Sequence, residues 1–199
     1  MPGTRSAEEL SAPLGGVGTG HLVFTRGAAH LKIRVDATMD DLFRARFEGK
    51  APLIEVASGT VSVKYRPSLH HTTGEVMLAG RIPWSIECRF GMSDVDADLE
   101  DLRLVRWEVT AGASKIKARL PRPTGTVAIR IGAGASNVEL TRPEGVPVRV
   151  RIGAGASKLT VDDFTGTGKI AWRSPDYETA EGRYDIEIGA GASNVTIRA

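Results

Sequence analysis

The stretch IGAGASNVEL, at residues 131–140, occurs in nearly the same form twice more, as IGAGASKLTV from Ile152 and as IGAGASNVTI from Ile188. Glycine, alanine and serine form its centre, and apolar residues alternate with polar ones on the far side. Glycine-rich centres between apolar runs occur in phosphate-binding loops, in calcium-binding loops and in the corners of repeat proteins. The way in which this stretch recurs decides among the three.

A glycine before the small-residue corner recurs at a nearly constant spacing. From Gly91 the next three such glycines follow after 21, 22 and 21 residues, the last of them being Gly155. Gly27 lies 64 residues before Gly91, close to three units, and Gly191 lies 36 residues after Gly155, one unit with an insertion. This regularity predicts a repeat protein.

Apolar residues alternate with a period of two on both sides of each corner. In VAIRIG, for example, Val127, Ile129 and Ile131 share one face, whereas Ala128 and Arg130 point the other way. Alternating β-branched residues bounded by glycine and proline are typical of half-buried strands. Each unit is therefore predicted to be a strand, a corner, a second strand and a turn.

We expect an all-β fold, a β-solenoid or β-helix-like stack of short strands with repeats of about 21 residues. Near-identical corners at constant spacing favour stacked coils, in which only small side chains fit between one corner and the next. An antiparallel sandwich of hairpins stays open as an alternative. The sequence TMDDLFRARFEG at 38–49 predicts one short helix near the N-terminus, which would cap the stack.

The chain divides into an unpatterned start and a patterned remainder. Residues 1–20 are expected to be a flexible lead-in, and 21–199 a single β-repeat domain. Within that domain, 21–80 is the atypical N-terminal part with the capping helix, and 81–199 holds the regular repeats. The sequence ends directly after the strand NVTIRA, so a bare sheet edge is expected at Ala199.

The glycine-rich corners do not match either kind of ligand loop. A dinucleotide fingerprint needs a third glycine where Asn137 stands, and a helix after it, whereas here a second strand follows. Calcium prefers carboxylate ligands, but the polar corner residues are serine, asparagine and lysine. We predict no cofactor and no metal at these corners.

No catalytic constellation stands out either. Asp94, Asp96 and Asp98 would share one face of a strand, which is the only acidic cluster that a β-helix hydrolase or lyase could use. His70 and His71 lie in a polar turn, and Cys88, the only cysteine, alternates with apolar residues as a buried thiol does. We therefore expect no catalytic residues and no enzyme.

Two sets of residues are candidates for contacts with other molecules. Outward-facing cations of successive units would form a stripe for an anionic partner such as an acidic protein surface or phospholipid headgroups. Two aromatic residues in the excursion at 169–182 could contact a partner or stack on sugar rings. The cationic set is Lys115, Lys117, Arg119, Arg130, Arg149 and Arg151, and the aromatic set is Trp172 and Tyr177.

Composition limits the class of protein. The 199 residues are 41% hydrophobic and 25% charged, with a net charge of +2, which is too mild to predict nucleic-acid binding. No run approaches the roughly 18 apolar residues of a membrane span, and the start has no signal-peptide pattern. We expect a cytoplasmic protein whose contact with membranes is at most peripheral.

The motif W-x-I-x-x-x-x-G-x-S-D-V-x-A-D-L-x-x-L at 84–102, followed by VTAGASKIKARLP and IGAGASNVEL, resembles the C-terminal domain of the bacterial Lia-type proteins. These are also called cell wall-active antibiotics response proteins, and the related adhesin-like toastrack repeat domains are similar too. The resemblance covers roughly residues 22–198. It implies a role in sensing or restraining an envelope-stress response through protein contacts, and it supplies no catalytic residues.

Three functions follow as hypotheses. The first is a non-enzymatic interaction or sensory module of the envelope-stress type, which binds a protein partner or itself through a sheet edge or the basic face. The second is an adhesin-like or carbohydrate-binding β-solenoid that uses Trp172 and Tyr177. The third is the β-helix hydrolase or lyase described above.

Overall fold

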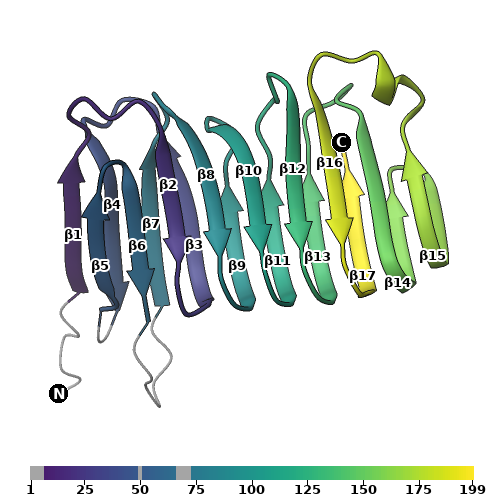
Figure 1. Cartoon of the computed structure of the whole chain (residues 1–199), viewed down its shortest axis with the longest axis horizontal. Helices are drawn as coiled ribbons and strands as arrows, with labels where there is room; N and C mark the ends of the chain where they lie inside the picture. Colours follow the sequence, from purple (N-terminus) through teal and green to yellow (C-terminus); the bar gives the residue numbers. More distant parts are fainter. Residues whose placement is uncertain (1–6, 49–50, 66–72) are drawn as a thin grey trace, which may run out of the picture.

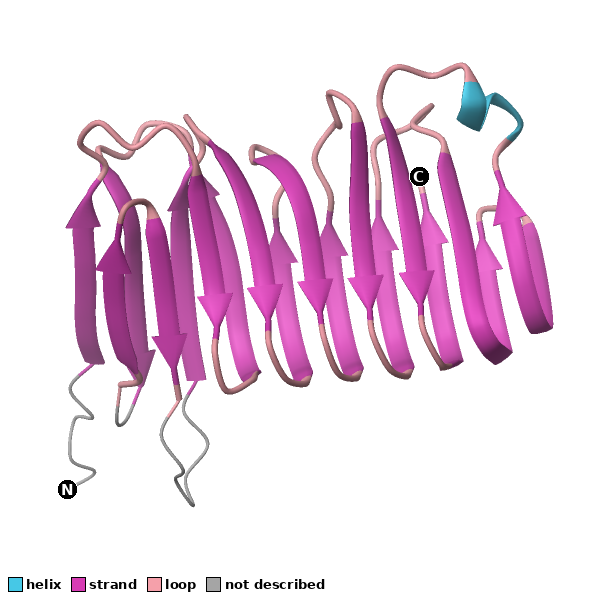
Figure 2. Ribbon diagram, viewed as in Figure 1, coloured by secondary structure: helices cyan, strands magenta, loops and turns pink. Residues whose placement is uncertain are grey.

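The computed structural model describes residues 7–48, 51–65 and 73–199. These residues form one continuous sheet of seventeen strands, which is folded into two facing walls, and one short 3-10 helix, η1 (Figures 1 and 2). The elements are β1 (Ala7–Pro13), β2 (Gly20–Phe24), β3 (Ala28–Asp36), β4 (Asp41–Glu48), β5 (Leu53–Ala57), β6 (Thr60–Lys64), β7 (Thr73–Ala79), β8 (Pro83–Cys88), β9 (Met92–Asp98), β10 (Arg103–Val109), β11 (Ala113–Arg119), β12 (Thr126–Ile131), β13 (Ala135–Thr141), β14 (Val148–Val161), β15 (Phe164–Arg173), η1 (Pro175–Glu178), β16 (Arg183–Ile188) and β17 (Gly191–Arg198).

Each coil contributes one strand to each wall. The front wall of Figure 1 runs in the order β5, β6, β2, β8, β10, β12, β16 and the first part of β14. The rear wall runs β1, β4, β7, β3, β9, β11, β13, β17 and the second part of β14. Successive coils pair in parallel from β6 and β7 onward, so the stacked-coil prediction is confirmed and the antiparallel sandwich is wrong.

The core lies between the walls, because every second residue of each strand points inward. Trp84, Ile86 and Cys88 of β8 are fully buried, as the period-two pattern predicts. The two polar groups of the largest core side chains find backbone partners. The indole of Trp84 donates to the carbonyl of Ala79 at 2.8 Å, and the Tyr184 hydroxyl donates to the carbonyl of Pro121 at 2.7 Å. These bonds tie two strands of the front wall, β8 and β16, to the end of β7 and to the segment after β11.

The small-residue corners stack directly on one another. A Cβ added at Gly132 would lie 2.3 Å from the carbonyl oxygen of Thr110, and one at Gly189 would lie 2.3 Å from that of Gly132. One at Gly153 would lie 2.2 Å from the carbonyl oxygen of Gly189. Any side chain would collide with the neighbouring coil there, so glycine is required for close approach of two backbones. The corners are structural, as the spacing predicts.

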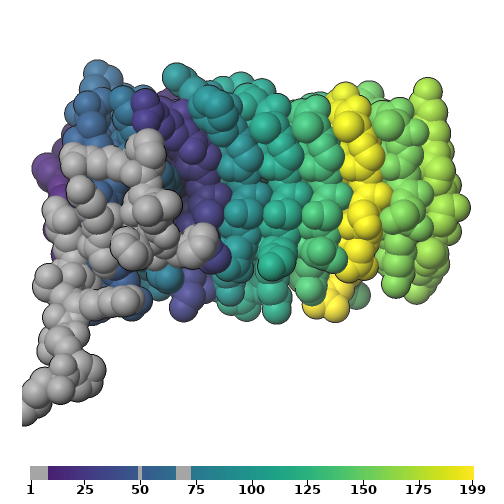
Figure 3. All heavy atoms as spheres, turned by 90° about the horizontal axis from the view of Figure 1, so that it is seen from below, coloured from purple at the N-terminus to yellow at the C-terminus, as the bar shows by residue number. Residues whose placement is uncertain are grey.

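The order of coils in space differs from their order in the chain. The last coil, β16–β17, lies between the coil β12–β13 and β14, and β14 is followed by the antiparallel β15 at the end of the stack. Seen from below in Figure 3, the yellow band of the last coil is enclosed by green on both sides. The bare edge expected at Ala199 is therefore wrong, because β17 has a partner strand on each side.

The predicted helix at 38–49 is also wrong. Residues 41–48 form β4, in which Ala45 and Phe47 are buried and Arg44 and Arg46 are exposed, an alternation typical of a strand. The apparent helix start is a turn, in which Asp36 Oδ1 accepts hydrogen bonds from the backbone amides of Thr38 (2.8 Å) and Met39 (3.1 Å). Among the described residues the structure has no α-helix.

The expected flexible lead-in is partly ordered. Residues 1–6 lie outside the described part of the chain, but Ala7–Pro13 forms β1, which pairs antiparallel with β4. At the other end of the stack, the regular coils stop at β14. β14 continues through its corner for 14 residues, and β15 follows it back, so the 36-residue spacing of the glycines corresponds to a terminal hairpin.

Candidate functional site

The predicted cationic stripe is split between the two walls. Lys115, Lys117 and Arg119 lie on β11 in the rear wall, whereas Arg130 of β12 and the two arginines of β14 lie in the front wall. Six cations on opposite faces cannot meet one flat partner. The prediction of a single stripe is wrong, because alternate strands of the chain belong to different walls.

In the front wall the cations are paired with acids of β16. Asp185, which is buried, accepts hydrogen bonds from Arg149 (3.0 and 2.9 Å) and from Arg130 (2.9 Å). Arg151 bonds to Glu187 at 3.0 Å. Burial alone would raise the pKa of Asp185, but the hydrogen bonds from Arg149 and Arg130 outweigh it and lower the pKa to about 2. This cluster is a structural tie between three strands.

In the rear wall the acids and cations also neutralise each other. Lys117 lies in register between Asp96 on one side and Glu139 on the other, and Arg119 forms an ion pair with Asp98. The other two aspartates of the acidic run have partners as well. Asp94 lies 2.5 Å from His30, and Asp96 lies 3.1 Å from Arg34. The carboxylates that a hydrolase would need are thus already bound to a histidine and two arginines.

The two aromatic candidates differ in their surroundings. Tyr177 of η1 is buried, and the guanidinium groups of Arg149 and Arg183 lie over its ring, 4.9 and 5.2 Å from the ring centroid. The expectation of an exposed Tyr177 is therefore wrong, because the ring is already engaged by these two arginines. Trp172 is partly exposed, and its ring stacks on Phe164 with centroids 5.7 Å apart and an interplanar angle of 23°.

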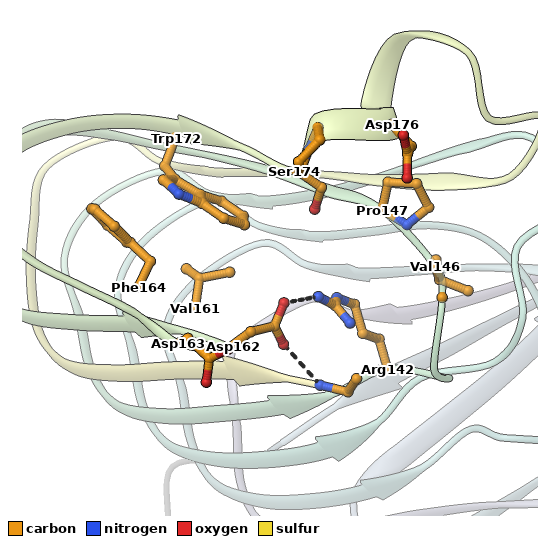
Figure 4. A pocket seen from close by; sticks show the side chains of 13 residues that line it. Arg142, Val146, Pro147, Val161, Asp162, Asp163, Phe164, Trp172, Ser174 and Asp176 are labelled. Atoms are coloured by element: carbon orange, nitrogen blue, oxygen red, sulfur yellow. Dashed lines mark hydrogen bonds and ion pairs between the residues drawn. The ribbon is translucent and has the colours of Figure 1, made fainter.

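Trp172 lines a cleft at the β15 end of the molecule, which we call the end cleft (Figure 4). Its volume is about 370 Å³, within the range of small-ligand sites. Its walls come from the turn after β13, from the β14–β15 hairpin and from the segment before η1. The lining residues are Arg142, Gly145, Val146, Pro147, Val161, Asp162, Asp163, Phe164, Trp172, Ser174, Pro175, Asp176 and Ala199.

The inserted coil assembles this cleft. The end of β17 lies between Arg142 and Asp162, because the amide of Arg142 donates to Arg198 and the amide of Asp162 donates to Ile197. The side chains of Arg142 and Asp162 form an ion pair across it, and the amide of Ala199 donates to the same carboxylate at 3.1 Å. Without β17 in this position the two walls of the cleft would have no common support.

The upper rim is fixed by Ser174. Its hydroxyl accepts a hydrogen bond from the amide of Val148 at 3.0 Å, and its own amide donates to the carbonyl of Val148 at 2.9 Å. Pro147 and Pro175 flank this pair and restrict the backbone further. The cleft is therefore a preformed feature of a rigid framework.

The charges of the end cleft are unequal. Its lining contains three aspartates and one arginine, and only Asp162 has an ionic partner. Asp163 and Asp176 are exposed, and no side chain in the described ranges forms an ion pair with either. The cleft is thus acidic although the chain as a whole carries a net charge of +2.

The sequence contains one signal of this site, the break in spacing between Gly155 and Gly191. The excursion predicts Trp172, but the acidic residues and Arg142 were missed, because they belong to three segments (the turn after β13, the β14–β15 turn and η1) that only the folded stack brings together. Cys88 is buried, and burial raises the pKa of its thiol. His70 and His71 lie outside the described residues.

The described residues hold neither a metal-binding cluster nor a membrane-spanning helix. Over residues 7–48, 51–65 and 73–199, no group of three or more histidine, cysteine, aspartate or glutamate side chains is arranged to hold a metal ion. Within the same ranges no helix is long and apolar enough to cross a membrane.

The chain has relatives of known fold. A crystal structure of a "putative cell adhesion protein" from Clostridium sporogenes is similar, with a TM-score of 0.66 and 19% sequence identity over 97% of this chain and 98% of that one. No curated protein matches the chain. Residues 2–141 match the family model described as the N-terminal domain of toast_rack, DUF2154. That match spans more than half of the sequence and confirms the toastrack resemblance, so this chain belongs to the toast-rack family.

Proposed function

We propose that this protein is a non-enzymatic interaction module of a cell-envelope stress response, which acts by binding a protein partner at the end cleft. Membership of the toast-rack family supports a module without catalysis, and the adhesion protein of the same fold fits that class. The observation that carries the proposal is the end cleft itself. It is preformed, and it combines an aromatic surface with two carboxylates that have no ionic partner in the described part of the chain.

The position of the cleft also favours a protein partner. β15 is the last strand of the stack, and it pairs only with β14 among the described strands. Its outer edge therefore presents backbone amide and carbonyl groups beside the cleft, which an extended segment of another protein can pair with. The acidic run of the rear wall and the Asp185 cluster of the front wall are less suited to recognition, because their charges are already paired.

A test in the native host addresses this function. We expect deletion of the gene to change the expression of an envelope-stress reporter after treatment with a cell wall-active antibiotic, and wild-type protein to restore it. A photo-crosslinking residue placed at Thr167, on β15, should capture one defined partner, and the same residue at Ser114, in the middle of the rear wall, should not. An unchanged reporter in the deletion strain would contradict the proposal.

The second candidate is an adhesin-like module that binds carbohydrate. The observation that favours it is the partly exposed Trp172, since aromatic rings stack on sugar rings, with carboxylates beside it to accept hydrogen bonds from hydroxyl groups. Only one of the two aromatic residues expected for this role remains available. Glycan binding that is lost in W172A and retained in Y65F would support it, and an array without hits would contradict it.

A further inference from the structure

We propose that the end cleft binds a basic group, the guanidinium or ammonium of an arginine or lysine side chain on an extended segment of the partner protein. This inference rests on the proposed function and specifies the chemistry of the same site. Four observations carry it, namely the charge of the lining, the aromatic pair, the buried arginine and the neighbouring free strand.

The charge of the lining favours a cation. Arg142 neutralises Asp162, which leaves the carboxylates of Asp163 and Asp176 without a counter-charge. In Figure 4 they come from different sides of the cleft, Asp163 from the β14–β15 turn and Asp176 from η1. Both residues line the cleft, so their charges favour a cation there over a neutral sugar.

The aromatic pair supplies the second component of a cation site. Trp172 and Phe164 both line the cleft, and their rings stack with centroids 5.7 Å apart. A guanidinium or ammonium group over an indole is attracted by the negative face of the ring, and indole is the best of the aromatic side chains for this contact. The aliphatic stem of an arginine or lysine would pack on the partly exposed ring of Trp172.

Arg142 is a buried, fixed part of the cleft wall. Its side chain is only 5% exposed, and its Nε atom has no hydrogen-bond partner among the described residues. Because Arg142 fixes Asp162, the incoming cation is directed to the two remaining carboxylates.

A protein segment explains the site better than a free amine does. The cleft adjoins β15, whose outer edge has no partner strand in the described chain. An extended segment can pair with this edge, and its alternate side chains then point to one side, which places one of them in the cleft. Lys169 and Arg173 lie on β15 itself, so they favour a segment with acidic or neutral residues on either side of its single basic one.

Nuclear magnetic resonance tests this with the intact chain and three probes. The probes are acetyl-Thr-Val-Arg-Val-Thr-amide, the same peptide with the neutral isostere citrulline, and the disaccharide of N-acetylglucosamine. The readout is the indole N–H resonance of Trp172, assigned with W172F, and Trp84 and Trp107 serve as buried internal references. We expect saturable movement of the Trp172 resonance with the arginine peptide and a dissociation constant about tenfold weaker with citrulline.

The variant D163N/D176N removes both charges without changing shape, and the control D101N/E48Q removes two exposed charges elsewhere. We expect the arginine peptide to bind at least about tenfold more weakly to the first variant and unchanged to the second. Thermal unfolding verifies that both variants are folded. Equal binding of the arginine and citrulline peptides, response to the disaccharide alone, or no response to any probe would each overturn the cationic site. The reporter assay in the host fails or succeeds independently of these outcomes.

Discussion

Gly189 lies directly against the carbonyl oxygen of Gly132, so close that a Cβ at Gly189 would approach that oxygen to 2.3 Å. The two glycines belong to β-coils that are neighbours in space but not in the chain. We expect Gly189→Ala to lower the free energy of unfolding by about 2 kcal/mol, the cost of overpacking a tight contact. The control is Gly125→Ala, where a new Cβ meets nothing within 4 Å. Equal denaturation midpoints for the two variants would contradict the stacked corners.

Asp185 holds the front wall together, so its neutralisation should be costly. Asp185→Asn leaves Arg149 and Arg130 without their carboxylate inside a partly buried cluster. We expect a loss of about 3 kcal/mol in the free energy of unfolding at neutral pH, as for the breaking of other buried pairs. Asp101→Asn, which changes an exposed residue without an ion pair in the described ranges, should have little effect. Chemical denaturation of both variants measures the difference.

The same carboxylate predicts a pH dependence. Its pKa is about 2 in the folded protein, below the ordinary value of 3.8, so the folded state holds the ionised form more strongly than the unfolded state does. The stabilisation is complete above about pH 4 and is lost as the pH falls toward about 2. Between pH 6 and pH 3, wild-type protein should therefore lose more stability than Asp185→Asn. Parallel loss in the two proteins would refute this role of Asp185.

The thiol of Cys88 should react only after unfolding. It is fully buried in the core, burial raises its pKa, and its Sγ donates to the carbonyl of Gly91 at 3.4 Å. A raised pKa means that little thiolate is present at pH 8, and the walls exclude the reagent. We expect slow labelling by a thiol reagent in buffer and complete labelling in denaturant. Rapid labelling of the folded protein would show that the core around β8 opens readily.

Much of the fold could be predicted from the sequence, because its two strongest signals are regular patterns along the chain. The period of two in VAIRIG indicates strands, and the constant spacing of the glycines indicates corners, without any knowledge of which strands pair. The segment at 38–49 was mistaken for a helix because of its local sequence. Asp36 and Thr38 form a turn that resembles a helix start, while Ala45 and Phe47 alternate with arginines as strand residues do.

The order of the coils could not be predicted, because near-identical corners can stack in any order. The charges on neighbouring strands give a physical reason for the observed order of the coils. Direct pairing of β12 with β14 in the same alignment would set Arg130 beside Arg151, whereas the inserted β16 places Glu187 between them. The end cleft depends on this insertion, so its residues could not be grouped from their positions in the chain.

The insertion of β17 between β13 and β14 is the central claim, and cysteine pairs test it most directly. Ser136 of β13 lies in register with Ser193 of β17, whose hydroxyl lies 3.2 Å from that of Ser157 of β14. Neighbouring strands are about 4.8 Å apart and can form a disulfide, whereas strands one further apart, at roughly 9.6 Å, cannot. The buried Cys88 can remain in place. We predict oxidation of S136C/S193C and of S157C/S193C to disulfides, and none in S136C/S157C; a disulfide in S136C/S157C with none in S136C/S193C would contradict the inserted coil and, with it, the end cleft.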